Sequence, residues 1–389
     1  LHTARAMALI DMERLIPALA LVDELCQQYT HDAIKTLTDG DVPMWHHKLL
    51  HAWCARLPPT PHDGFTSSLD DLKASCVWPE VHLAERCGPY FADALSGAVP
   101  YQELLFPGGS MEAVMPFYEN AIPTHFYNKC VVAAVQAIIA LMRDERRIVA
   151  LEVGAGTGGT ASSVLPACGG ACGTYIFTDV SEFFLRQARV RFAEFHCLEY
   201  ALLNIDADPC MQGFAMRQCD LIISTNCLHA TPFMCNTMRH CQQLLRLGGT
   251  IVVNEGLGDF AFTQITFGMT DGWWLFGEVG DPERVGQGSP LLSWRQWQSF
   301  LSDSSFQRSY CMQGDSLLRA QAVMVAQVGF PECSTARSAL HPCCHLVTGG
   351  LGGLGLLTAR LIASKHTPKA LVLISRSARV QAGSEPEWE

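Results

Sequence analysis

The sequence predicts an α/β fold in which a mostly parallel sheet follows an all-helical N-terminal region. Three observations support this prediction. Apolar residues in the first third recur at helical spacing, whereas from residue 148 short apolar runs alternate with helical segments. A glycine-rich turn, Gly154 to Gly158, joins the first apolar run to a helical segment, which allows backbone to approach a ligand closely. The last two strand candidates are separated by a short turn, which predicts an antiparallel edge.

The helical region is predicted from the spacing of its apolar residues. Within residues 5–55 the apolar face of a helix is marked by Leu9, Ile10, Leu15, Ile16, Leu19, Leu21, Val22 and Leu25. The Pro-rich segment 58–61 interrupts this pattern, and helix-like pieces continue to about residue 105. A strongly apolar helix is expected at 128–142, before the charged run 143–147. We assign residues 1–145 to a helical subdomain.

The sheet is predicted from the alternation of short apolar strands with helices. The expected strands are 148–153, 174–179, 199–205, 219–224 and 250–255, with edge strands at 306–312 and 319–327, and the expected helices are 158–167, 181–196 and 233–246. The third connection carries Asp206-Ala-Asp-Pro in place of a clear helix. Strands and helices that alternate in this way predict a sheet covered on both faces, and we assign it residues 146–328.

A second glycine-rich turn lies near the C-terminal end. Residues 329–342 read as a linker, and Gly349 to Gly355 then separate a short strand candidate from a helix that reaches about residue 366. A strand is expected at 370–374. One βαβ unit of this size cannot bury both faces of its sheet, so residues 343–389 are predicted to be an incomplete domain. Because the chain also lacks an initiator Met, we expect it to be a piece of a longer protein.

Composition narrows the class of protein. The 389 residues are 49% hydrophobic and 17% charged, which supplies enough apolar side chains for sizeable cores. A net charge of −11 argues against nucleic-acid binding, and without an uninterrupted apolar run of about 18 residues no membrane span is expected. Many of the 17 cysteines lie inside apolar runs, where a thiol acts as a small hydrophobe. Cys168/Cys172 and Cys343/Cys344/His345 lack a second pair at zinc-site spacing. We therefore expect no metal site and a reducing, cytoplasmic setting.

Four polar or glycine features follow strands whose carboxyl ends should share one edge of the sheet. They are the turn Gly154–Gly158, Asp179 at the end of the second strand, Asp206 after the third, and His229 after the fourth with Glu255 ending the fifth. An acid at position 179 can accept the two ribose hydroxyls of a cofactor, and Asp206 is placed to reach an adenine amino group.

Each feature also has a structural interpretation. The glycines can serve a tight turn alone, Asp179 can be an acid at a helix N-terminus, and His229 can be a buried structural histidine. Glu255 can be a loop acid that faces solvent. The structural interpretation is weaker for the whole set, because four independent positions would have to converge on one edge of the sheet by chance.

These residues carry a resemblance to a known family. Leu151–Thr160 resembles motif I of class I S-adenosylmethionine methyltransferases and, more narrowly, of the C-methyltransferase domain of polyketide synthases. The other segments that fit are Leu105–Ser110, Phe126–Asn128, Phe177–Ser181, Leu203–Pro209, Gln212–Phe214, Cys219–Thr231, Leu244–Thr250, Gly272–Leu275 and Pro290–Trp294. The resemblance covers roughly residues 10 to 328. It implies a Rossmann-like class I methyltransferase fold with an N-terminal helical lid. The segments Thr348–Gly355 and Ile374–Ser377 resemble the start of a polyketide-synthase ketoreductase.

The resemblance implies methyl transfer from S-adenosylmethionine to the α-carbon of a β-ketoacyl chain. That chain is a thioester on the phosphopantetheine arm of an acyl carrier protein, and the domain would work among neighbouring synthase domains. His229 matches the family's catalytic histidine and would be the general base, and Glu255 matches the carboxylate that orients it. The residues expected to bind the cofactor or line its pocket are Glu152, Gly154, Gly156, Gly158, Asp179, Val180, Asp206, Asn226, Tyr127 and Asn128. Trp273 and Trp274 either wall the channel or belong to the core.

Three alternatives remain open. The first is an inactive methyltransferase-like scaffold, as the equivalent region of animal fatty-acid synthases resembles, although neither the glycines nor His229 and Glu255 are lost here. Cys227, where a branched aliphatic residue is more usual, is a mild departure. The second is an NADP-dependent reductase, since Gly349–Gly355 and Arg376 suit a dinucleotide, but NADP is expected only in an intact ketoreductase domain. The third is an O- or N-methyltransferase, which would not explain the ketoreductase-like tail.

Overall fold

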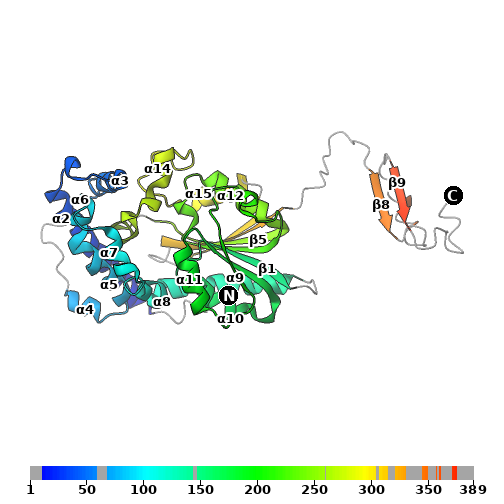
Figure 1. The fold of residues 1–389 in the computed structure, drawn as a ribbon, viewed down its shortest axis with the longest axis horizontal. Coiled ribbons are helices and arrows are strands. Elements are labelled where there is room, and N and C mark those ends of the chain that lie inside the picture. The colour runs from blue at the N-terminus through cyan, green and yellow to red at the C-terminus, as the bar shows by residue number, and fades with distance from the viewer. Residues whose placement is uncertain are drawn as a thin grey trace. The chain divides into compact units, whose positions relative to one another are not determined.

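The computed structural model describes most of the chain up to residue 329 and short parts of the remainder. The described residues are 11–58, 68–142, 147–258, 260–303, 306–313, 320–329, 344–348, 356, 359–360 and 370–374. The chain divides into two compact units, Leu1–Phe330 and Pro331–Glu389. Figure 1 shows the first unit as a group of helices beside a twisted sheet.

The N-terminal region is helical. Its α-helices are α2 (Met12–Thr36), α3 (Trp45–Cys54), α4 (Leu69–Lys73), α5 (Trp78–Cys87), α6 (Phe91–Ser96), α7 (Tyr101–Leu105), α8 (Met115–Asn120) and α9 (Ile122–Leu141). The side chain of Asp11 caps α2 by accepting a hydrogen bond from the Arg14 amide, 3.3 Å away. Leu15, Val22 and Leu25 of the predicted apolar face are buried, whereas Leu9 and Ile10 lie outside the described residues.

Helix α9 begins at Ile122, earlier than the predicted residue 128, because Pro123 supplies a favourable first turn. Among the described residues it is the helix that is long and apolar enough to cross a membrane by length and composition. A buried core helix meets the same criterion. Phe126, Val131 and Val135 are fully buried in the core of the first unit, and α9 packs against α10, so burial in this protein accounts for its composition.

The sheet follows at residue 148. Its strands are β1 (Ile148–Val153), β2 (Cys172–Asp179), β3 (Leu198–Leu202), β4 (Cys219–Thr225), β5 (Leu245–Gly256), β6 (Phe306–Gln313) and β7 (Gln321–Val328). The strand order is β3-β2-β1-β4-β5-β7-β6, and the first five strands pair in parallel. Strand β7 is antiparallel to both β5 and β6. The predicted parallel sheet with an antiparallel edge hairpin, preceded by helices, is confirmed.

Helices cover both faces of this sheet. Helices α9, α10 (Gly159–Cys168) and α11 (Glu182–Arg191) lie on one face, and α12 (Met234–Leu244) and α15 (Trp294–Asp303) lie on the other. Helix α13 (Ala261–Ile265) packs on α2 and α5, and α14 (Leu275–Val279) packs on the 3-10 turn Asp271–Trp274. Side chains alternate along β1, so Ala150 joins the core shared with α9, α10 and α11, while Leu151 joins a second core with α12 and α15. The two layers of helices therefore fix the strands whose carboxyl ends carry the predicted site.

Within the sheet region, the largest differences from the predicted boundaries are at the end of α11 and the start of β5. Helix α11 ends at Arg191, not at residue 196, because the ring of Phe192 turns inward and packs over Gly158. Strand β5 begins at Leu245, not at residue 250, because Leu245 pairs with Cys219 ahead of an irregularity in the β4–β5 register. The third connection contains only a short 3-10 turn at Pro209–Gln212, as its sequence suggested.

In the second unit, β8 (Cys344–Thr348) and β9 (Ala370–Ile374) pair in parallel. The predicted turn at 349–355 and Arg376 lie outside the described residues.

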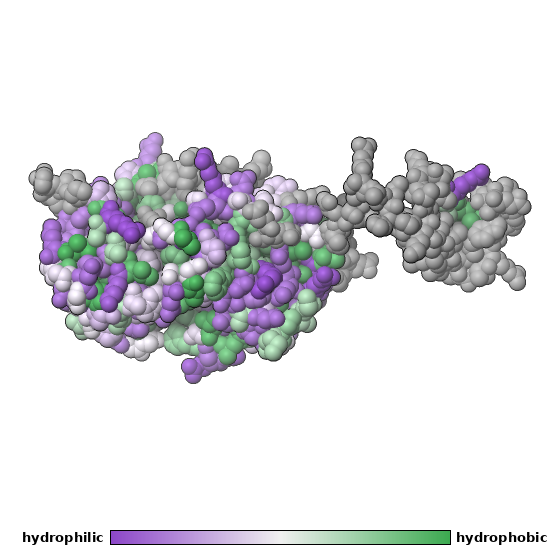
Figure 2. All heavy atoms as spheres, turned by 90° about the horizontal axis from the view of Figure 1, so that it is seen from above, coloured by the Kyte–Doolittle hydropathy of each residue, from purple (hydrophilic) through white to green (hydrophobic). Residues whose placement is uncertain are grey.

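On the face of the molecule drawn in Figure 2, the coloured hydrophobic residues form small separate patches among hydrophilic ones.

Candidate active site

The glycine-rich turn packs directly against the segment that follows β4. Gly154, Gly156 and Gly158 all have positive φ, at 61°, 52° and 77°, a region that side-chain-bearing residues rarely adopt. A Cβ atom on Gly154 would lie only 2.1 Å from Sγ of Cys227. Glycine is therefore required at position 154 both by its conformation and by the close approach of the Cys227 side chain.

Asp179 holds this turn in place. It ends β2, its Oδ2 accepts a hydrogen bond from the Gly156 amide at 2.9 Å, and its Oδ1 accepts one from the Ser181 amide at 2.8 Å. Burial raises the pKa of the Asp179 carboxyl, and the backbone hydrogen bonds oppose that shift. The next residue, Val180, is 70% exposed, so an apolar surface lies open beside the carboxylate at this edge of the sheet.

Glu152 lies below the turn at the end of β1 and is buried. Its Oε2 accepts a hydrogen bond from the hydroxyl of Tyr175, 2.7 Å away. Burial raises the pKa of Glu152 to about 8, although the hydrogen bond from Tyr175 acts in the opposite direction. The side chain is thus tied to the neighbouring strand β2.

Asp206 and Asn226 follow the third and fourth strands. Oδ1 of Asp206 is buried and has no hydrogen-bond partner, which leaves an acceptor available. Asn226 has a positive φ of 46° and its side-chain oxygen accepts a hydrogen bond from the Gly256 amide at 3.1 Å. This bond joins the ends of β4 and β5.

His229 and Glu255 are in direct contact. His229 lies in the 3-10 turn Leu228–Ala230, and its Nδ1 is 2.6 Å from Oε2 of Glu255 at the end of β5. The other carboxylate oxygen of Glu255 accepts hydrogen bonds from the amides of Cys227 and Leu228, at 2.9 and 2.7 Å. Because an ionised carboxylate can only accept, Nδ1 carries the hydrogen and Nε2 is the nitrogen left to act on a ligand.

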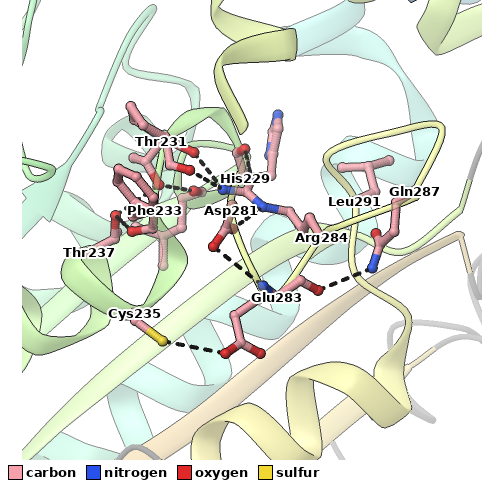
Figure 3. Close-up of polar contacts among 12 residues, drawn as sticks. His229, Thr231, Phe233, Cys235, Thr237, Asp281, Glu283, Arg284, Gln287 and Leu291 are labelled. Atoms are coloured by element: carbon pink, nitrogen blue, oxygen red, sulfur yellow. Dashed lines mark hydrogen bonds and ion pairs between the residues drawn. The ribbon is translucent and has the colours of Figure 1, made fainter. Parts of the chain in front are cut away.

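A buried arginine fixes the backbone that carries His229 (Figure 3). Arg284 donates to the carbonyl oxygens of His229 and Thr231, each at 2.6 Å, and its Nε donates to Oδ2 of Asp281 at 2.6 Å. Arg284 and Asp281 are each 1% exposed. Burial lowers the pKa of Arg284 and the paired Asp281 raises it. The guanidinium therefore ties the histidine-bearing turn to the segment that follows α14.

A cavity of about 570 Å³ opens beside His229. The helical region and the 256–274 segment supply most of its walls, which include Phe117, Tyr118, Tyr127, Phe262, Phe267 and Trp273. Of the predicted residues, Tyr127, Asn226 and His229 line it, and the Trp273 ring meets the His229 ring at a centroid distance of 5.0 Å. Glu255, at the end of β5, and Asn128, on α9, lie outside its lining. The remaining residues predicted to bind the cofactor lie at the glycine turn and at or after the ends of β1 to β3.

Two of the predicted pocket residues differ in what they contact. Tyr127 is buried and lines the cavity. Asn128 is buried beneath it, and its side-chain oxygen accepts a hydrogen bond from the Thr160 hydroxyl at 3.3 Å. Trp274 donates to the Gly268 carbonyl at 2.7 Å and belongs to the core, so only Trp273 of the pair reaches the cavity.

The sequence patterns above do not indicate Arg284, Asp281 or the cavity residues Glu80 and Tyr118. Arg284 and Asp281 follow α14 in a stretch rich in charged residues and glycine, which gives no local sign of burial. One feature of the sequence could have indicated the ion pair: Asp281 and Arg284 are three positions apart, a spacing that can bring opposite charges together within one turn. In the part of the chain that the structure describes, no group of three His, Cys, Asp or Glu side chains could hold a metal ion.

Comparison with known proteins agrees with this geometry. The model of the methyltransferase domain family matches residues 151–251, and that of the KR domain matches residues 343–388. The chain is 36% identical over 244 residues to polyketide synthase ThaG of Burkholderia thailandensis. The aligned region covers 62% of this chain and 4% of ThaG. It is 30% identical over 315 residues to reducing polyketide synthase BOA6 of Botryotinia fuckeliana, and this aligned region covers 76% of the chain and 12% of BOA6. The chain thus spans only a small part of these relatives.

Solved structures share the fold over most of the chain. The DszA carbon methyltransferase is 27% identical, with a TM-score of 0.69 over 80% of this chain and 90% of that one. The CurJ carbon methyltransferase is 24% identical, with a TM-score of 0.75 over 84% of this chain and 96% of the CurJ chain. The trans-methyltransferase CalH, solved as a complex with SAH, is 24% identical, with a TM-score of 0.63 over 80% and 90%.

The sheet order, the glycine turn and the helical region define a class I methyltransferase fold. Within that class, the chain belongs to the carbon-methyltransferase domains of polyketide synthases, and its C-terminal residues are part of a KR domain.

Proposed function

We propose that this domain transfers a methyl group from S-adenosylmethionine to the α-carbon of a β-ketoacyl thioester carried by an acyl carrier protein. The contact between His229 and Glu255, at the wall of a largely apolar cavity and next to the glycine turn, is the observation that carries the proposal. No other pairing of a base with an orienting acid faces the cavity among the described residues.

His229 would remove the proton. The α-carbon between two carbonyl groups is acidic enough for an imidazole to deprotonate near neutral pH, and the resulting enolate attacks the sulfonium methyl group. Glu255 fixes the hydrogen on Nδ1 and stabilises the imidazolium that forms, as the acid of a catalytic dyad does. Arg284 keeps the carbonyl of His229 in place, so the ring does not have to be ordered during the reaction.

The residues near the glycine turn fit the cofactor. Asp179 can accept hydrogen bonds from ribose hydroxyls, the exposed Val180 offers an apolar surface to the adenine ring, and the unpartnered Oδ1 of Asp206 can accept from the adenine amino group. Gly156 leaves room for the methionine end of the cofactor, since an added Cβ there would meet nothing closer than the Gly154 carbonyl oxygen at 4.0 Å. When bound, S-adenosylmethionine supplies the electrophilic methyl group.

The helical region would act as the lid and substrate subdomain. Its α2, α8 and α9 supply cavity residues such as Val22, Phe117 and Tyr127, so the acyl chain would be enclosed by aromatic and aliphatic side chains. Enclosure excludes water from the enolate and holds it in line with the transferable methyl group.

The test is methyl transfer by the purified chain to a β-ketoacyl carrier protein, followed by intact-protein mass spectrometry. We expect the acyl carrier protein to gain the mass of one CH₂ group only when S-adenosylmethionine is present. Calorimetry run in parallel measures cofactor binding. A chain that binds no S-adenosylmethionine would instead be an inactive scaffold within its synthase, and methylation at oxygen or nitrogen would show another class of methyltransferase.

A further inference from the structure

The cavity beside His229 contains two polar groups that neither the proton transfer nor the glycine turn uses. Glu80 on α5 lines the cavity, is only 3% exposed, and has an Oε2 atom without a hydrogen-bond partner. Tyr118 on α8 lines the same cavity, and its hydroxyl makes no hydrogen bond to any described residue. Helices α5 and α8 pack against each other, so the two side chains come from adjoining parts of the wall.

The other carboxyl groups of the cavity wall have different surroundings. Oδ1 of Asp23 accepts a hydrogen bond from the Phe262 amide at 3.2 Å, and Oδ2 accepts one from Gln27 at 2.9 Å. Asp23 therefore has a structural task at the start of α13. Glu24 lines the wall but is exposed to solvent. Glu80 alone among these three combines burial with an unsatisfied oxygen.

A buried carboxyl oxygen without a partner is costly, and such atoms are rare in folded proteins unless a ligand or ordered water satisfies them. Burial raises the pKa of Glu80 to about 7, so the group is present in both protonation states near neutral pH. Both states keep at least one oxygen that can accept a hydrogen bond. The surrounding Phe117, Phe262 and Phe267 offer no such acceptor and suit the methylene groups of a chain.

We propose that Glu80, together with the hydroxyl of Tyr118, forms a subsite that binds a hydrogen-bond donor on the thioester substrate. The donor is either an amide N–H of the pantetheine arm or a hydroxyl group on the acyl chain. This inference rests on the proposed methyl transfer to a carrier-bound thioester, and it adds a recognition element at a distance from the reacting carbon.

The experiment compares two substitutions of Glu80 on four small β-ketoacyl thioesters. Each thioester carries either an N-acetylcysteamine group, which has an amide N–H, or a propyl group, which has none. In each case the acyl chain either carries a distal hydroxyl group or lacks one. Glu80→Met removes the acceptor at similar size, whereas Glu80→Gln keeps one acceptor oxygen. Tyr118→Phe removes the second polar group should the Glu80 variants fail to fold. Glu112→Gln, which removes an exposed carboxylate outside the cavity lining, is the control.

We expect Glu80→Met to raise KM about tenfold or more for thioesters that carry the recognised donor, with a smaller rise for Glu80→Gln. The same variants should leave the KM for the propyl thioester without a hydroxyl unchanged, and Glu112→Gln should leave the KM for all four thioesters unchanged. An effect limited to the N-acetylcysteamine pair assigns the donor to the pantetheine arm, and an effect limited to the hydroxylated pair assigns it to the acyl chain. An equal loss on all four substrates, or no loss on any, overturns the subsite. If the unsubstituted domain methylates none of them, the proposed function fails instead.

Discussion

Oε2 of Glu255 lies 2.6 Å from Nδ1 of His229, while Oε1 of the same carboxylate receives the amide hydrogens of Cys227 and Leu228. One side chain therefore fixes both the ring of the histidine and the backbone turn that carries it. Because Glu255 is completely buried, neither contact is weakened by competition with bulk water.

Replacing this carboxylate by an amide should separate its two tasks. In Glu255→Gln the side-chain oxygen can still accept from the backbone amides, but the NH₂ group would face Nδ1 and force the hydrogen onto Nε2, the nitrogen needed as base. We expect kcat to fall roughly 10²–10⁴-fold with the Kd for S-adenosylmethionine within about twofold. Initial rates and calorimetry measure the two quantities. Glu278→Gln, on the exposed surface of α14, is the control, and a Glu255→Gln rate equal to that control would remove Glu255 from catalysis.

Arg284 offers a test of positioning through the backbone. Lysine keeps the charge but cannot reach Asp281 and the carbonyls of His229 and Thr231 together. We expect Arg284→Lys to lower kcat about tenfold or more and to lower the Tm, because buried acceptors lose their donors. Arg246→Lys is the matched control, since Arg246 also joins a carboxylate, Asp220, to a carbonyl oxygen, that of Gln218. A loss of Tm in both variants with kcat unchanged in both would make Arg284 purely structural.

The glycine turn should tolerate no side chain at its first position. In Gly154→Ala the new Cβ would have to displace Cys227, and the residue would also keep a φ of 61°. We expect cofactor binding to be lost and the unfolding free energy to fall by about 2–4 kcal/mol, the sum of backbone and overpacking costs. Gly108→Ala shares the positive φ, at 57°, but has open space around it, so it measures the backbone cost alone. Equal effects of the two substitutions on cofactor binding would contradict the close approach.

Glu152 predicts a dependence of stability on pH. Its pKa is raised from 4.5 to about 8 by burial, so the folded state retains a proton that the unfolded chain has lost. The stability from this proton is complete below about pH 4.5 and is lost as the pH rises through about 8. Glu152→Gln removes the titration. The unfolding free energy of Glu152→Gln minus that of the parent should therefore increase between about pH 5 and 8 and then level off, because only the parent loses stability over this range. Urea unfolding measures both values. Glu199→Gln, at an exposed position of β3, is the control for the substitution itself. A difference between Glu152→Gln and the parent that stays constant with pH would show that Glu152 is ionised in the folded state.

The parts of this molecule that sequence reasoning predicted depend on local patterns. The strand that precedes Gly154 and the turn itself are encoded within about ten residues, and the placement of His229 and Glu255 follows from the rule that parallel strands end at one edge. The distance of 2.6 Å between Nδ1 of His229 and Oε2 of Glu255 could not be predicted, because it depends on how the turn after β4 bends.

The residues that were missed take their role from distant packing. Arg284 becomes buried only because the segment after α14 folds over the 229–232 turn, and Glu80 becomes buried only because α5 packs on other helices of the first unit. The burial of Arg284 leaves no periodic signal in the sequence. Glu80 does lie at helical spacing from the buried Leu83, Ala84 and Cys87, but a charged residue at that position does not by itself indicate burial. The early start of β5 has the same origin, since Leu245 is drawn into the sheet by its pairing with Cys219.

The most direct test of the account is the removal of the His229 imidazole. The measurement is the mass of a β-ketoacyl carrier protein after incubation with S-adenosylmethionine and the His229→Ala variant, with calorimetry of cofactor binding on the same preparation. We expect that the cofactor still binds and that the acyl carrier protein gains no CH₂ group, because the α-proton is not removed. Methylation at a rate close to that of the unsubstituted domain would contradict it.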